Sequence, residues 1–172
     1  ACVVPMDLHA VSLLAHALFL STDDEVAAAE SALRTRFPEG YRAYVTPLGE
    51  GILGGDLVRI YPPHRILHGP NDVATWRKRV EQYWFWGDGP LLRKTDAAEC
   101  VIVGDTTAGD ELVFRPSDPD RILLLPHDSE EVHAVEGGLL ASVEWLCSSG
   151  IVTEAFTERA FVEVETPMLQ VQ

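Results

Sequence analysis

The chain has 172 residues, of which 47% are hydrophobic, and its formal net charge is −14. This length and composition are typical of one folded domain with a sizeable core, and they argue against global disorder. The negative charge disfavours nucleic acid or an anionic membrane as the main partner, because both repel an acidic surface.

Three cysteines (Cys2, Cys100 and Cys147) make an odd number without close spacing. Cys100 begins an apolar strand pattern and Cys147 ends an apolar helical pattern. We therefore expect both to be buried thiols in a reducing, cytoplasmic compartment. The apolar stretch 11–20 is about half as long as a membrane span and lacks the pattern of a clear signal peptide.

The first strong element is a helix over residues 23–36. Thr22 and Glu25 form the pattern of a capping box, in which each side chain bonds the other residue's backbone. The apolar positions that follow have helical spacing, and Pro38 ends the helix. A short second helix is expected to bury four residues: Tyr41, Tyr44, Val45 and Leu48.

Residues 49–54, Gly-Glu-Gly-Ile-Leu-Gly, have the spacing of a dinucleotide-binding fingerprint. That motif must follow a strand and open a helix. Here it follows a helix and precedes the strand predicted over 56–61, so a plain loop is the better interpretation.

A third helix is predicted from Asn71 as N-cap, with Asp72 in its first turn. Its inward face would hold Val73, Trp76, Val80 and Tyr83. The aromatic run 84–86 follows directly. Because three consecutive aromatic residues cannot all face one core, at least one is expected near the surface.

The central feature is an antiparallel meander over residues 100–126. Strands are predicted at 101–103, 112–114 and 122–124, with a polar turn over 116–120. An edge strand within 130–135, a helix over 139–146 with Leu146 inward, and a tail anchored by Phe156 and Phe161 complete the chain. The predicted fold class is α+β, a mostly antiparallel sheet flanked by helices.

Constellations that would indicate catalysis or a metal site are weak. His64 and His68 are four residues apart, but the neighbouring prolines argue against a long helix that would align them. His127 and His133 lie among acids that could bind a metal, although titrating surface histidines are the simpler interpretation. We therefore expect no catalytic residues, no metal and no cofactor.

The order of several motifs resembles the SUKH superfamily, the Smi/Knr-type group that includes many bacterial immunity proteins. Residues 37–44, Phe-Pro-Glu-Gly-Tyr-Arg-Ala-Tyr, are similar to the family's Leu-Pro-x-x-Tyr-x-x-Phe segment. Residues 103–105 and 109–114 resemble its central Gly-Asp strands, and 143–146 its final helix. The resemblance covers about 22–150 and leaves 151–172 as an extension of the single domain 1–172. It implies a non-enzymatic immunity protein that neutralises a toxin.

Acidic residues are concentrated in segment 96–136, which holds eleven acids and two arginines. We predict that this segment meets a protein partner with a basic surface, such as a nuclease-like toxin, with exposed tryptophans as anchors. The candidate contacts are Trp84, Trp86, Asp88, Asp105, Asp110, Asp118, Asp120, Glu130 and Glu131. Three alternatives stay open: a merely solvated acidic surface, a Smi/Knr-type regulatory module without a toxin, and a small-ligand binder or enzyme that uses a cleft near the Gly-rich loop.

Overall fold

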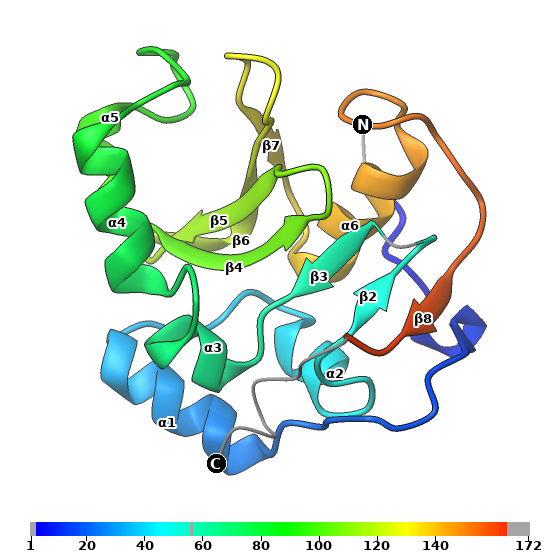
Figure 1. Ribbon diagram of the computed structural model, residues 1–172. Coiled ribbons are helices and arrows are strands. Elements are labelled where there is room, and N and C mark those ends of the chain that lie inside the picture. Colours follow the sequence, from blue (N-terminus) through cyan, green and yellow to red (C-terminus); the bar gives the residue numbers. More distant parts are fainter. Residues whose placement is uncertain (1–2, 56, 165–172) are drawn as a thin grey trace.

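Helices flank a mostly antiparallel sheet, so the predicted α+β class is confirmed (Figure 1). The computed structural model describes residues 3–55 and 57–164. The helices are the 3-10 helix η1 (Leu8–Ala10), α1 (Asp23–Leu33), α2 (Tyr41–Val45), α3 (Pro63–His68), α4 (Val73–Gln82), α5 (Lys94–Ala97) and α6 (Leu139–Ser148). The strands are β1 (Ser12–Leu13), β2 (Ile52–Leu53), β3 (Val58–Ile60), β4 (Val101–Thr106), β5 (Glu111–Arg115), β6 (Asp118–Leu125), β7 (His133–Val135) and β8 (Ala160–Val162).

Within the described residues the strands form one sheet in the order β1-β8-β2-β3-β4-β5-β6-β7. The pair β1–β8 is parallel and the other neighbours are antiparallel. The predicted meander is β4, β5 and β6, in which Val113 lies opposite both Ile102 and Leu123. β7 adds the predicted edge strand, although it is shorter than the segment proposed for it.

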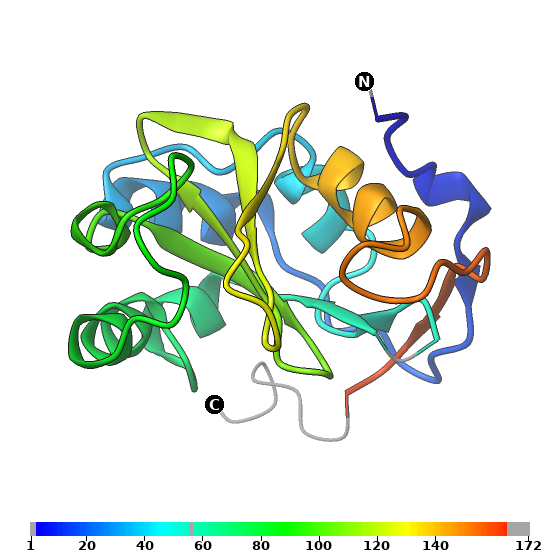
Figure 2. The same ribbon diagram turned by 90° about the horizontal axis from the view of Figure 1, so that it is seen from above.

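The meander is covered on both faces, which explains why residues 111–114 are all buried. Helix α4 contacts β4, whereas α6 contacts β6 and β7. Figures 1 and 2 both show the meander between α4 and α6. One boundary was wrong: the turn predicted over 116–120 is confined to Pro116 and Ser117, because Asp118 and Asp120 already belong to β6.

Helix α1 begins as predicted and ends one turn early. Thr22 Oγ1 accepts from the amide of Glu25 at 3.1 Å, and Glu25 Oε2 accepts from the amide of Thr22 at 2.7 Å, which completes the capping box. Arg34 adopts the left-handed conformation that terminates helices, with φ 54°. The chain then turns so that Phe37 reaches the core instead of extending the helical stripe.

All four predicted core residues of the second helix are buried. In the Gly-rich loop that follows, the space beside the glycines is occupied by other segments of the chain. A Cβ atom on Gly49 would lie 2.0 Å from the Phe19 carbonyl oxygen, and one on Gly51 would lie 2.2 Å from the Phe161 ring. These glycines therefore allow backbone to pass under other segments, which is a structural role unlike the cradling of a phosphate.

Two expectations about α4 were wrong, its N-cap residue and the burial of Tyr83. The N-cap of α4 is Asp72, which accepts from the amide of Thr75 at 2.8 Å. Asn71 instead takes the left-handed conformation and uses its side chain elsewhere. Tyr83 follows the helix in extended backbone and is 69% exposed. Prolines start α3, which brings the rings of His64 and His68 to 5.6 Å.

The described C-terminal part contributes strand β8 to the sheet. Leu146 is fully buried in α6, as predicted. Phe161 is buried in β8, which inserts between β1 and β2, and Phe156 packs against the core. Cys100 and Cys147 are buried free thiols, and burial raises their pKa values to about 12 and about 11. Cys2, Asp56 and the end of the tail lie outside the described residues.

Candidate binding site

The predicted partner contacts differ in how far the fold already engages them. Trp86 and Asp110 are buried, and Asp105 and Asp120 are partly exposed but paired with arginines. Trp84 is half-buried, and its indole N–H donates to the Gly87 carbonyl. The remaining side chains, Asp88, Asp118, Glu130 and Glu131, are exposed and available to a partner.

Arginines from outside segment 96–136 neutralise many of its acids. Four such ion pairs are present in the part of the chain that the structure describes: Arg36–Asp120, Arg59–Asp105, Arg79–Glu111 and Arg93–Asp96. In the first three the partners are far apart in the sequence, and in the fourth the arginine lies just before the segment. Asp120 shows the consequence most clearly. Its hydrogen bonds to Arg36 and to the amide of Glu39 lower its pKa to about 2. The charge imbalance of the linear segment thus overstates the acidity of the folded surface.

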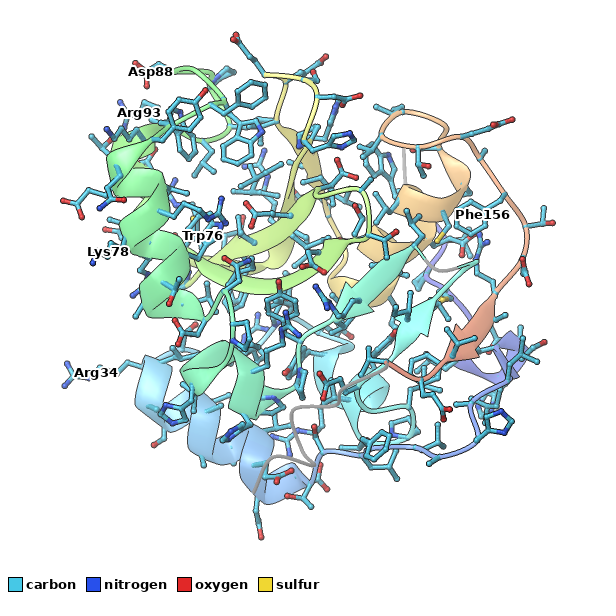
Figure 3. The ribbon with its side chains drawn as sticks, viewed as in Figure 1. Arg34, Trp76, Lys78, Asp88, Arg93 and Phe156 are labelled. Carbon is cyan, nitrogen blue, oxygen red and sulfur yellow. The ribbon has the colours of Figure 1, made fainter. Side chains whose placement is uncertain are left out.

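Four exposed acids lie on two loops. We call Asp88, Asp128, Glu130 and Glu131 the acidic rim. Asp88 lies after the aromatic run, and the other three lie between β6 and β7 (Figures 1 and 3). Among the described residues, none of the four has a lysine or arginine partner in an ion pair; Asp128 lies 4.0 Å from the ring of His127.

Trp86 joins these two loops and cannot serve as an exposed anchor, which corrects the prediction for this residue. Its side chain is 8% exposed, and Nε1 donates to the Pro126 carbonyl at 2.8 Å. The rings of Trp84 and Phe85 meet it edge-on at 5.2 and 5.8 Å. Because an indole N–H is satisfied when buried, Trp86 stabilises the position of the rim.

A buried glutamate organises the face of the sheet beneath α4. Glu111 accepts from Trp76 Nε1 at 3.1 Å, from Asn71 at 3.1 Å and from Arg79 Nη2 at 2.5 Å. Figure 3 shows Trp76 directed from α4 toward the sheet. Each Glu111 oxygen thus has a donor, and a satisfied buried charge fixes the orientation of its partners.

The same network continues toward β3 through Asn71 and Tyr61. Asn71 donates to the Tyr61 hydroxyl at 3.2 Å, and that hydroxyl donates to Asp105 at 2.7 Å. Burial raises the pKa of Tyr61 to about 12, so its hydroxyl stays a donor at neutral pH. Arg65 lies over the Tyr61 ring at 4.3 Å.

The buried Asp110 pairs with the partly exposed His127. Asp110 is 1% exposed and accepts from Thr106 Oγ1 at 2.7 Å and from the His127 amide at 2.9 Å. His127 Nδ1 lies 2.7 Å from the same carboxylate, which places the ring proton on Nδ1. This hydrogen bond raises the pKa of His127, whose ring is 40% exposed.

A pocket of about 530 Å³ lies where these groups meet. It is lined by Asn71, Arg79, Tyr83, Phe85, Trp86, Gly109, Glu111, Pro126 and His127. Its volume falls in the range of small-ligand sites, and aromatic walls with a few convergent polar groups are their usual composition. We call it the aromatic pocket.

The sequence pattern did not identify Arg79, Glu111 and Asn71 as site residues, and it did not indicate that Asp110 pairs with His127. Arg79 follows Trp76 by three residues, so the sequence spacing could have predicted that both lie on one face of a helix. The sequence could not predict that both contact Glu111, because that contact depends on how α4 packs on the sheet.

Within residues 3–55 and 57–164, no three histidine, cysteine, aspartate or glutamate side chains are grouped to hold a metal ion. None of the helices in these residues has the length and apolar character to cross a membrane. No protein-family model matches the chain, and searches of curated proteins and solved structures return no match either.

Proposed function

We propose that the chain is a non-enzymatic intracellular binding protein that neutralises a cognate toxin with a basic, nuclease-like surface. The motif order that resembles the SUKH superfamily supports this assignment, since members of that group most often act as immunity proteins. The observation that carries the proposal is the acidic rim, in which four exposed carboxylates lie on two loops tied together by Trp86.

Such a rim would raise the rate at which a basic partner associates and would disfavour acidic partners. Exposed charges contribute little binding energy individually, because water and salt screen them. Complementary charge raises association rates and rejects partners of like sign. A basic toxin would therefore be attracted to the rim, and a docked inhibitor covering its active surface would block it without any chemistry on this chain.

The experiment is capture of partners from the source cell by the tagged full chain, compared with two charge-reversed variants. Glu130→Lys/Glu131→Lys alters the rim. Glu154→Lys/Glu158→Lys makes the same change in net charge at exposed positions between α6 and β8. We expect a basic protein that the wild type and the second variant retain and the rim variant loses.

The captured partner then distinguishes an immunity protein from a regulatory module. Its expression alone should arrest growth, and co-expression of the wild-type chain should restore it. A partner that is harmless when expressed alone would favour the Smi/Knr-type regulatory role. Equal capture by both variants would contradict docking through the acidic rim.

A further inference from the structure

We propose that the aromatic pocket binds a small aromatic carboxylate, with Arg79 and His127 holding the carboxylate and the ring seated among Tyr83, Phe85 and Trp86. This site is separate in function from the acidic rim and does not depend on the proposed toxin.

The hydrogen-bonding groups that face the pocket decide the sign of the ligand. Glu111 lines the pocket and Asp110 bonds the lining residue His127. Both carboxylates are buried and already satisfied, with side chains 8% and 1% exposed. Neither retains the freedom to receive a cation. They act instead on the two cationic groups beside them, Arg79 and His127, whose positions they fix.

Arg79 has donors to spare. Its side chain is 48% exposed, and within the described part of the chain its hydrogen bonds all run through Nη2. The Nη1 and Nε donors therefore remain for a ligand. Nη2 already donates to Asn71 and Glu111, and Nε and Nη1 point to different edges of the guanidinium. Each of these two atoms can therefore donate a single charge-assisted hydrogen bond to a ligand carboxylate.

His127 adds a donor whose charge depends on pH. Asp110 holds Nδ1, so Nε2 is the atom free to meet a ligand, and it donates only when the ring is protonated. The charged groups around the ring are Asp110, Asp128 at 4.0 Å from Nε2, and the Arg79–Glu111 pair across the pocket. Asp128 is 69% exposed, so it opposes an anion only weakly.

A cationic ligand fits the same pocket poorly. It would approach the Arg79 guanidinium and find both nearby carboxylates occupied. The aromatic walls accept any flat ring, because Tyr83 is exposed and Phe85 is half-buried beside the mouth. The charge of the ligand, and not its ring, therefore decides which aromatic compounds bind.

The test compares indole-3-acetate with tryptamine, which share one ring system and carry opposite charges. Binding to the full chain is measured by titration calorimetry and by the NMR shift of the Trp86 indole N–H. We expect indole-3-acetate to bind at least about tenfold more tightly, the effect of one charge-assisted contact. Its affinity should fall as the pH rises through the pKa of His127, which the hydrogen bond to Asp110 raises above its ordinary value.

Variants assign the contacts. Arg79→Gln should weaken indole-3-acetate about tenfold, whereas Lys78→Gln removes the same charge from the neighbouring position on α4, outside the pocket, and should change nothing (Figure 3). Asp128→Asn should strengthen binding by removing an opposing charge. If Arg79→Gln does not fold, His127→Gln should still abolish the pH dependence.

Several results would overturn the assignment. Equal or tighter binding of tryptamine would show that the pocket selects cations. Unchanged affinity in Arg79→Gln, or the absence of saturable binding by indole-3-acetate at millimolar concentration, would show that the arginine and the pocket take no such ligand.

Discussion

At the scale of single residues, carboxylates in this protein act mainly as internal partners. Asp120 accepts two bonds from Arg36 at 2.9 and 2.8 Å and one from the Glu39 amide at 2.8 Å. The two residues of this ion pair are 84 positions apart, so no local pattern indicates it. The polar turn predicted around Asp118 and Asp120 was reasonable in composition, but it could not reveal that one of these aspartates is a cross-link.

This cross-link predicts a specific acid sensitivity. The folded pKa of Asp120 is about 2, below its ordinary value of 3.8, so its contribution to stability is present above pH 3.8 and disappears as the pH falls toward 2. In Asp120→Asn the free energy of unfolding should fall less steeply over this pH range than in the wild type. The difference should be less than about 1 kcal/mol, because the ion pair is partly exposed. Urea unfolding at several pH values measures it. Asp118→Asn is the control, and identical acid profiles in all three proteins would contradict the assignment.

Leu146 tests the core at the same scale. It is fully buried on the inner face of α6, and truncation of a buried leucine leaves a cavity. Leu146→Ala should lower the free energy of unfolding by about 2–5 kcal/mol. Ile151→Ala, at a position 57% exposed, should cost less than about 1 kcal/mol. A loss for Leu146→Ala as small as that of its control would show that this helix face is wrongly assigned.

At the scale of elements, the sequence predicted the helices and strands that are determined by neighbouring residues. The capping box of Thr22 and Glu25, the apolar run at 101–103 and the helical spacing before Leu146 each predicted an element that the structure contains. Boundaries failed where a distant contact decides them. Helix α1 stops at Leu33, and the chain that follows carries Arg36 to Asp120 and Phe37 into the core.

The Gly-rich loop yields the prediction that belongs to this scale. A Cβ atom on Gly51 would lie 2.2 Å from the Phe161 ring and 2.6 Å from the Val162 carbonyl oxygen, so β8 would have to move. Gly51→Ala should cost about 1–3 kcal/mol, as overpacking does. Gly89→Ala, where a Cβ atom meets nothing within 4 Å, should be nearly neutral. Equal unfolding midpoints in urea for the two variants would show that β8 does not pack on this loop.

At the scale of the whole molecule, folding redistributes the charge that the sequence displays. Counting residues in 96–136 predicted a broad acidic face, yet Arg36, Arg59, Arg79 and Arg93 enter from outside and pair with its members. The acids of the segment that stay exposed without an arginine or lysine partner, among the described residues, are Asp118, Asp128, Glu130 and Glu131, and the last three belong to the acidic rim. The aromatic pocket was likewise invisible in the sequence, because α4, the aromatic run and two strand ends assemble it from separate segments.

The central claim is that the acidic rim guides a basic partner. The most direct test is the stopped-flow association rate with the captured partner at several salt concentrations. For the wild type we expect fast association at low salt that slows steeply as the Debye length shrinks. Glu130→Lys/Glu131→Lys should reduce the low-salt rate about tenfold and flatten the salt dependence, whereas Glu154→Lys/Glu158→Lys should change both much less. Rates that are insensitive to salt, or equally reduced in the two variants, would contradict the claim.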